Sequence, residues 1–187
     1  MDNQELMRRI AAGDARAFEQ LYQQYAGVVL NLCFRLLRDR EDANDLTQEV
    51  FVRAFTNAGS FQHRAHPLTW LYRIATNLCL NHLRRKKRQE HYGSVLDGEL
   101  LFQDRLAPAP ERPDEELERQ EAQSLVWRAL GSLPPAQRAV LVLQKYEGLS
   151  CQEIAKVLDC SVGSVQSRLH RAKENLARIL MLFLREE

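Results

Sequence analysis

Polar and basic side chains recur along one face of residues 162–178, near the C-terminus. At spacings of three and four, this face carries Ser164, Arg168, Arg171, Asn175 and Arg178. Hydroxyl, amide and guanidinium groups bind DNA phosphates and the edges of bases in the major groove. The segment holds four basic residues and only one acidic residue. The pattern therefore predicts contact with DNA, and the plainer alternative is an amphipathic helix with a solvated face.

A second group of side chains suited to nucleic acid lies between residues 59 and 88. Phe61, Trp70 and Tyr72 are aromatic, and residues 50–89 hold eight basic side chains and no acidic one. An unpaired base stacks on an aromatic ring, and a flipped base can be held in the same way. The segment therefore predicts a surface for unpaired bases. Phe61 and Trp70 are also candidates for the hydrophobic core, so both interpretations stay open.

Three carboxylates have a different character. Asp42, Asp45 and Glu49 follow one another at spacings of three and four, on one face of a predicted helix. Such a cluster can hold a divalent metal, as in a nuclease or a helical di-iron protein. The Glu-x-x-His partners of a di-iron site do not occur in the sequence. An acidic docking surface for a basic protein partner, or a solvated face, is the better interpretation.

No pattern in the sequence indicates catalysis. The chain has no phosphate-binding loop, no Ser-His-Asp order and no zinc-binding spacing. Cys33, Cys79, Cys151 and Cys160 form no CxxC pair, and we expect reduced thiols. We therefore predict a protein without enzymatic activity, cofactor or metal. No run approaches the ~18 apolar residues that cross a bilayer, and no signal peptide is visible, so we expect a cytoplasmic location outside the membrane.

The formal net charge of +1 hides an uneven distribution. Residues 1–92 hold 14 basic and 10 acidic side chains, residues 93–122 hold 3 and 9, and residues 123–187 hold 9 and 6. The acidic middle part also contains three prolines and few large apolar residues after Phe102. This composition is typical of a linker between two compact units. Each unit carries a positive balance, which favours a polyanionic partner.

Apolar residues recur with helical spacing almost throughout, and no segment alternates long enough for a strand. Predicted helix starts are marked by capping side chains, namely Asp14, Asp39, Ser150 with Glu153, and Ser161. Residues 151–158, a short turn and a helix from Val162 form a helix-turn-helix. The fold class is therefore all-α, with two small helical domains joined by a flexible acidic linker. We assign the domains to residues 1–92 and 118–187, and the linker to residues 93–117.

Four segments, in order and spacing, resemble the extracytoplasmic-function (ECF, group IV) sigma factors of bacterial RNA polymerase, of the E/W type. Their domain four is similar to LPPAQRAVLVLQKYEGLSCQEIAKVLDCSVGSVQSRLHRAKENL. Their core-binding region 2.2 is similar to DANDLTQEVFVRAF, and their regions 2.3 and 2.4 to TWLYRIATNLCLNHLRRKKR. The N-terminal segment with which these sigma factors usually begin is similar to GDARAFEQLYQQY. The resemblance covers nearly the whole chain apart from the linker.

The resemblance implies a subunit that binds core RNA polymerase and directs promoter-specific transcription initiation. The first domain would bind the β′ coiled coil and read the −10 element, and the second would sit on the β flap and read the −35 element. The implied polymerase contacts are Asp42, Asp45, Leu46, Gln48, Glu49 and Phe51. The implied −10 contacts are Phe61, Arg64, Thr69, Trp70, Tyr72, Arg73, Thr76, Asn77, Leu80, Arg84 and Lys87. The implied −35 contacts are Ser161, Ser164, Gln166, Ser167, Arg168, Arg171 and Lys173.

The family also implies control by an anti-sigma factor, and no small-molecule substrate. Two other functions remain as alternatives. An autonomous helix-turn-helix regulator would bind duplex DNA by itself, most naturally as a dimer on two half-sites. A metal-dependent enzyme acting on nucleic acid would need the carboxylates of Asp42, Asp45 and Glu49.

Overall fold

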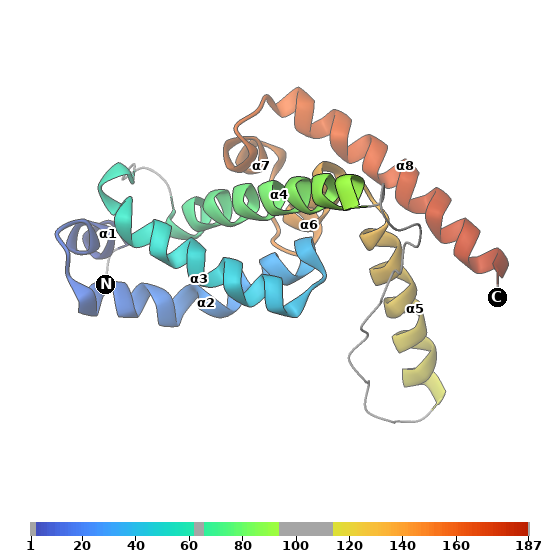
Figure 1. The fold of residues 1–187 in the computed structure, drawn as a ribbon, viewed down its shortest axis with the longest axis horizontal. Coiled ribbons are helices and arrows are strands. Elements are labelled where there is room, and N and C mark those ends of the chain that lie inside the picture. Colours follow the sequence, from blue (N-terminus) through green and yellow to red (C-terminus); the bar gives the residue numbers. More distant parts are fainter. Residues whose placement is uncertain (1–2, 62–65, 94–113, 187) are drawn as a thin grey trace.

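The computed structural model describes residues 3–61, 66–93 and 114–186, and every regular element in these ranges is helical. Figure 1 shows the arrangement. The elements are α1 (Asn3–Ala11), α2 (Ala15–Leu37), α3 (Arg40–Thr56), the 3-10 turn η1 (Ala58–Ser60), α4 (Pro67–Gly93), α5 (Asp114–Gly131), α6 (Pro135–Lys145), α7 (Cys151–Leu158) and α8 (Val162–Glu186). The all-α class predicted from the sequence is confirmed.

The N-terminal domain, α1 to α4, is built around three long helices that pack on one another (Figure 1). Its core contains fully buried aliphatic side chains from each of them, including Leu21, Leu32, Val50 and Leu71. Removing such side chains from water contributes roughly 1.5–3 kcal/mol each to folding. Packing of apolar stripes therefore fixes the three helices, and the remaining faces of α3 and α4 are left for function.

Two aspartates begin the long helices as the sequence predicts. Asp14 Oδ1 accepts hydrogen bonds from the backbone N–H groups of Arg16 (2.9 Å) and Ala17 (3.1 Å). Asp39 caps α3 in the same way. The guanidinium of Arg9, which donates to Asp14 at 2.7 Å, lowers the pKa of that carboxyl below its ordinary value. Short side-chain caps of this kind satisfy N–H groups that the helix itself leaves without partners.

The C-terminal domain, α5 to α8, contains the helix-turn-helix. Ser150 and Glu153 form the predicted capping box at the start of α7, and Ser161 Oγ accepts from the N–H of Ser164 (3.2 Å) at the start of α8. Between the two helices, Asp159 adopts a left-handed conformation with φ of 52°. Asp tolerates this region better than most residues. The tight turn therefore needs no glycine.

Predicted boundaries differ from the observed helices in detail. α5 begins at Asp114, so the linker assigned to residues 93–117 overlaps the first turn of a helix. Residues 94–113, which make up most of the assigned linker, lie outside the described residues. In the part of the chain that is described, no helix is long and apolar enough to cross a membrane.

The two domains are packed together. Helix α7 lies against α4, and α6 lies against α2. The buried side chains of both domains belong to one continuous apolar cluster, and at its edge Phe34 of α2 stacks on Trp127 of α5, with ring centroids 5.4 Å apart. From the sequence we expect two units that can sit far apart, whereas the structure shows them in contact.

Candidate nucleic-acid and protein interfaces

The outer side of α8 is a basic, hydroxyl-rich surface, which we call the α8 face. Gln166, Ser167, Arg171 and Lys173 are exposed, and Arg168 is half-buried. The opposite side of the same helix is buried through Val165, Leu169 and Ala172. Because α8 packs on α6 and α7 along that side, its polar side is turned to solvent. The free N–H groups of its first turn add a positive dipole end that favours a phosphate.

The apolar side chains that recur along α8 at spacings of three and four, from Val162 to Phe183, are buried only in the first half of the helix, at Val165, Leu169 and Ala172. Val162 is 37% exposed at the beginning, and Leu176, Ile179 and Phe183 are half-buried further along. Arg128 of α5 lies 4.8 Å above the ring of Phe183. The buried side chains therefore lie in the same half of α8 as the candidate DNA contacts. Their burial anchors that half of the helix and holds the contact side chains in place.

A surface on α4, the α4 face, lines a cavity of about 690 Å³. Its lining comes from three parts of the chain. Helix α4 contributes Thr69, Trp70, Arg73, Ile74 and Asn77. The end of α3 and the segment that follows it contribute Arg53, Asn57, Ser60 and Phe61, and α7 and its turn contribute Lys156 and Asp159. Trp70 is half-buried, and Arg73 and Asn77 are exposed. An aromatic wall with amide, hydroxyl and guanidinium groups suits an unpaired base and its phosphate.

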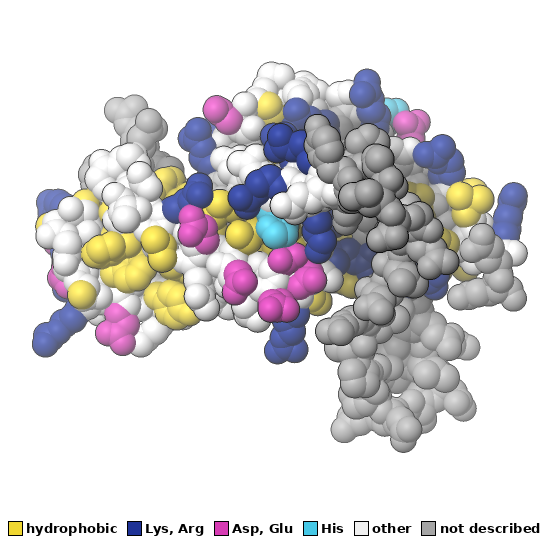
Figure 2. Space-filling model, viewed as in Figure 1, with side chains coloured by type: hydrophobic (Ala, Val, Ile, Leu, Met, Phe, Trp, Pro, Cys, Tyr) yellow, Lys and Arg dark blue, Asp and Glu magenta, His cyan; other side chains and the backbone are white. Residues whose placement is uncertain are grey.

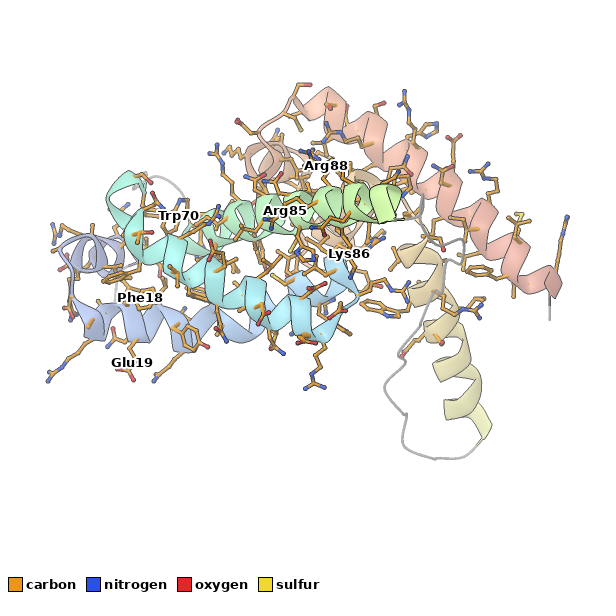
Figure 3. All side chains as sticks on the ribbon, viewed as in Figure 1. Phe18, Glu19, Trp70, Arg85, Lys86 and Arg88 are labelled. Atoms are coloured by element: carbon orange, nitrogen blue, oxygen red, sulfur yellow. The ribbon has the colours of Figure 1, made fainter. Side chains whose placement is uncertain are left out.

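Further along α4, Arg84 and Lys87 are exposed and Leu80 is half-buried. Figure 3 shows Trp70 near the start of α4 and the basic Arg85, Lys86 and Arg88 toward its end.

Three residues predicted to touch the −10 element are buried, which corrects their assignment as surface contacts. Phe61 is 5% exposed and packs its ring edge-on against Trp70, with centroids 5.4 Å apart. Thr76 is fully buried. Tyr72 is 3% exposed, and its hydroxyl donates to Glu147 Oε2 at 2.5 Å. Burial, followed by this hydrogen bond to a carboxylate, raises the pKa of Tyr72. Arg64 lies outside the described residues.

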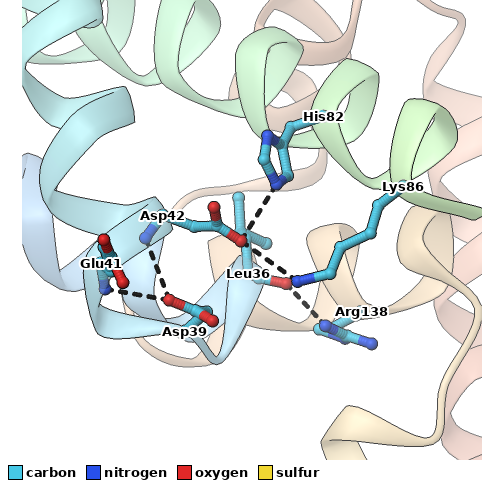
Figure 4. Close-up of polar contacts among 7 residues, drawn as sticks. All are labelled: Leu36, Asp39, Glu41, Asp42, His82, Lys86 and Arg138. Atoms are coloured by element: carbon cyan, nitrogen blue, oxygen red, sulfur yellow. Dashed lines mark hydrogen bonds and ion pairs between the residues drawn. The ribbon is translucent and has the colours of Figure 1, made fainter. Parts of the chain in front are cut away.

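The acidic side chains of α3 do not converge. Asp42 Oδ2 lies 3.0 Å from His82 Nε2 and 3.3 Å from Lys86 Nζ on α4 (Figure 4). Glu49 accepts from Arg53 Nε at 2.7 Å. Among the residues that the structure describes, no group of three or more His, Cys, Asp or Glu could hold a metal ion. The metal interpretation of this helix therefore has no geometric support.

Beside the acidic side chains lies an apolar surface that the sequence analysis missed. We call it the α2–α3 patch and define it by Phe18, Tyr22, Val52 and Phe55. Tyr22, Val52 and Phe55 are exposed by 44%, 57% and 42%. The ring of Phe18 lies 5.0 Å from that of Phe55. Figure 2 shows hydrophobic side chains gathered over these two helices, with acidic ones next to them at the start of α3. An exposed aromatic surface of this kind marks a protein interface.

The six predicted polymerase contacts differ in how exposed their side chains are beside the α2–α3 patch. Asp45 and Gln48 are exposed and Leu46 and Glu49 half-buried, so these four face outward along α3. Phe51 is 3% exposed and packs its ring on Tyr22 at 4.8 Å, so it supports the patch from below rather than contacting a partner directly. The spacing Gln48, Val52, Phe55 runs along one helix face and was the sequence signal for the patch.

Comparison with known proteins gives a consistent result for both domains. The family model for sigma-70 region 2 matches residues 21–89, and that for sigma-70 region 4 matches residues 123–176. The chain is 37% identical over 186 residues to the RNA polymerase sigma-H factor of Pseudomonas aeruginosa, covering 98% of this chain and 96% of the relative. It is 33% identical to the ECF RNA polymerase sigma-E factor of Escherichia coli, covering 93% and 92%. It is 32% identical to the ECF sigma factor SigW of Bacillus subtilis, covering 93% and 94%.

Two solved structures share the architecture. CnrH in complex with the cytosolic domain of CnrY superimposes with a TM-score of 0.63 at 28% identity, covering 96% of this chain and 97% of that one. The sigma factor RpoE from Bartonella quintana, in complex with the anti-sigma factor NepR, superimposes with a TM-score of 0.69 at 22% identity, covering 89% and 98%. The second likeness concerns the fold alone.

Proposed function

The chain belongs to the extracytoplasmic-function group of the sigma-70 family, and we propose how its two domains act on a promoter. As an ECF sigma factor it binds core RNA polymerase and directs promoter-specific initiation of transcription. The observation that carries the assignment of roles is that the region 2 and region 4 matches fall on separate domains, each with its own basic helix face. It contributes specificity rather than catalysis, and it acts in the cytoplasm, where polymerase works.

We assign the −35 element to the α8 face. Arg168 and Arg171 are placed to bind guanine edges or phosphates, and Gln166 to bind adenine. Ser161, Ser164 and Ser167 lie around the start of the helix and Lys173 near its middle, and they fix its register through phosphate contacts. The buried half of α8 supports this assignment because it holds the face rigidly.

We assign the −10 element to the α4 face and its cavity. Trp70 offers a ring for stacking, and Thr69, Arg73 and Asn77 offer hydrogen bonds at the rim. Phe61 acts as a positioning residue because it packs behind Trp70. Exposed Arg84 and Lys87 lie further along the helix, where the DNA backbone would run. A flipped base in this cavity would gain roughly 1–3 kcal/mol from stacking.

We assign core polymerase binding to the α2–α3 patch together with Asp45, Leu46, Gln48 and Glu49. An apolar centre with an acidic rim fits a partner surface that is apolar and basic. Asp42 and Phe51 position this surface from behind, Asp42 through His82 and Lys86. Phe51 does so through ring contacts with Phe18 and Tyr22. Within the family resemblance, the partners are the β′ coiled coil for this surface and the β flap for the C-terminal domain.

We further propose that an anti-sigma factor controls the chain. Support comes from CnrH, a structural neighbour at 28% identity that is described in complex with the cytosolic domain of CnrY. The exposed aromatic rings of the α2–α3 patch offer such an inhibitor the same surface that polymerase needs.

Run-off transcription on a pool of genomic fragments tests the proposed function. Core polymerase with the chain is expected to give promoter-dependent products that core alone does not give. Val52→Asp, which places a charge in the middle of the exposed patch, is expected to abolish both these products and co-elution with core. Asn31→Asp adds the same charge at an exposed position of α2 outside the patch and is expected to behave like wild type.

Two results would contradict the proposal. One is the absence of promoter-dependent products with an active core. The other is tight binding of the free chain to duplex DNA as a dimer on two half-sites, which is what an autonomous helix-turn-helix regulator would show.

A further inference from the structure

Helix α4 is capped at its start by a histidine ring. His66 comes directly before Pro67, the first residue of the helix. The backbone carbonyl of His66 accepts a hydrogen bond from the N–H of Trp70 at 3.3 Å, and its ring atom Nδ1 accepts one from the N–H of Leu68 at 3.2 Å. These are the two bonds that an N-cap residue makes. His66 is therefore the cap of the helix that carries the proposed −10 contacts.

The sequence around His66 favours this geometry. A residue before proline avoids the helical region and takes an extended backbone, which is the conformation that an N-cap needs. Pro67 has no N–H group, so the first helical position leaves no donor without a partner. Leu68 then supplies the first N–H of α4, and the His66 ring accepts it. The cap thus satisfies the first free donor of the helix.

This cap determines where the imidazole carries its proton. Because Nδ1 accepts a hydrogen bond, it holds no hydrogen, and the proton of the neutral ring lies on Nε2. The side-chain amide of Asn3 in α1 lies 3.2 Å from Nε2, and a half-turn of the amide presents its oxygen to the Nε2 proton. The ring of Tyr25 in α2 packs edge-on against the imidazole, with centroids 6.3 Å apart. Two neighbouring helices therefore hold the ring in the orientation that caps α4.

Protonation of the His66 ring would remove the cap. The second proton goes to Nδ1, where it points at the N–H group of Leu68, so that a donor faces a donor. The imidazolium also places a positive charge at the N-terminus of α4, which is the positive end of the helix dipole. Histidine is the side chain that ordinarily changes its charge between pH 5 and pH 8. The cap is therefore complete while the ring is neutral and is lost as the pH falls.

The charged groups on the elements around His66 belong to other pairs or lie further along their helices. Those of α1 and the turn after it pair with one another, Arg8 with Glu5 and Arg9 with Asp14. Helix α2 has no charged residue between Glu19 and Arg35, η1 has none, and α4 has none before Arg73. Burial raises the pKa of Tyr25, so its phenol stays neutral. Asp2, His63 and Arg64 lie outside the described residues.

We propose that His66 is a positioning residue for the −10 element, which holds the first turn of α4 while its ring is neutral and releases that turn when it is protonated. The turn carries Thr69 and Trp70, two residues of the cavity wall. Once it opens, the Trp70 ring is no longer presented for stacking with a base. Binding of the −10 strand therefore weakens as the pH falls, a consequence that rests on the proposed function.

Binding of a single-stranded −10 probe to the complex of this chain with core polymerase tests the proposal, over a series from about pH 8 to about pH 5.5. The probe comes from a promoter found by run-off transcription and is followed by fluorescence anisotropy. His66→Asn supplies a good N-cap that does not titrate. It is expected to match wild type at the high end of the series and to bind about 5-fold more tightly than wild type at the low end, since a lost cap typically costs ~1 kcal/mol.

Two further variants complete this series. His66→Ala has no cap at any pH and should bind about 5-fold more weakly than His66→Asn throughout. His170→Asn removes an exposed imidazole from α8, whose DNA element is absent from the assay, and should follow wild type at every pH. A merely structural role for His66 would give the same ratio between wild type and His66→Asn at every pH, and that result would overturn the proposal.

A measurement without DNA or polymerase separates this inference from the proposed function. In the free full-length chain with isotope-labelled histidine, the ring nitrogen shifts of His66 should show the Nε2-protonated form at about pH 8. As the ring is protonated, the Leu68 amide should exchange its hydrogen faster than it does in His66→Asn at the same pH. A proton on Nδ1 of the neutral ring would overturn the proposal. The expected shifts and exchange without promoter-dependent transcription would support the cap and contradict the proposed function, whereas transcription with unchanged exchange would do the reverse.

Discussion

The two basic helix faces of this protein have similar chemistry and different accessibility. The α8 face has its own domain behind it and solvent in front of it, whereas α4 is covered by the N-terminal helices on one side and approached by α7 on another. Both faces carry arginine, amide and hydroxyl groups. The difference teaches that side-chain composition identifies a nucleic-acid surface, while domain packing decides whether it is available.

The largest expected effect comes from removing arginines of the open face. Arg168→Ala with Arg171→Ala should weaken −35 duplex binding by about 30- to 150-fold, since two lost contacts at roughly 1–1.5 kcal/mol each cost about 2–3 kcal/mol together. If both contact phosphates, the slope of log K against log salt should fall by about 0.9 per contact. Affinity titrations over a salt series check this. Arg16→Ala with Arg40→Ala, exposed in the other domain, is the control, and equal loss in both pairs would remove the α8 face from the interface.

Breaking the contact between the domains at Glu147 should show in folding. The Glu147 side chain is 4% exposed and accepts from Arg35 Nη1 at 2.9 Å. Glu147→Gln removes the charge that Arg35 faces in this buried site, and we expect it to lower the free energy of unfolding by about 2 kcal/mol. The two domains should also become less coupled, so urea unfolding that is a single transition in wild type should separate into two. A variant with unchanged stability and one sharp transition would show that Glu147 does not couple the domains.

The α4 face should respond to the loss of its arginine, both in the free chain and in the complex with polymerase. Arg73→Ala should weaken binding of the −10 strand about 10-fold in the complex. In the free chain the effect should be slightly smaller, because Arg73 lies 3.6 Å from Asp159 there and an exposed ion pair of this kind is worth about 0–1 kcal/mol. Fluorescence anisotropy with the same probe compares the two states, with Arg88→Ala as an exposed control on α4. An Arg73→Ala chain that binds the probe in the complex as tightly as wild type would contradict the assignment of the α4 face.

The smallest expected effect concerns the cap of α7, the helix that approaches α4. Ser150→Ala should cost about 1 kcal/mol of stability. Hydrogen bonds from Ser150 lower the pKa of Glu153 below the ordinary 4.5. For an acid with a lowered pKa, this contribution is complete above pH 4.5 and is lost as the pH falls through the value in the folded protein. The hydrogen bond that Ser150 Oγ accepts from the Glu153 N–H does not titrate, whereas the one it donates to the Glu153 carboxylate does. The difference in thermal unfolding between wild type and variant should therefore shrink without vanishing from pH 7 to pH 3, and a constant difference would contradict it.

Local features of the fold could be predicted from the sequence. Asp14, Asp39 and the Ser150–Glu153 capping box act over three residues or fewer, so the signal lies within one turn. The buried side of α8 around Val165 and Leu169 follows from helical period alone. The same reasoning located both basic faces.

Long-range features could not be predicted. Arg35 and Glu147 are 112 residues apart in the sequence, and nothing local pairs them. Tyr72 and Thr76 lie on α4 among residues typical of a polar face, yet they are buried because helices from two domains pack around α4. The α2–α3 patch was missed because exposed aromatic residues and core aromatic residues look alike in a sequence.

Mapping transcript starts tests the central claim most directly. The 5′ ends of transcripts that core polymerase makes only with this chain are sequenced, and the DNA upstream of them is aligned. We expect two shared elements, near −10 and −35, with the preference at −35 weakened by Arg168→Ala and Arg171→Ala and that at −10 retained. An absence of chain-dependent starts, or a single palindromic element bound without polymerase, would contradict the account.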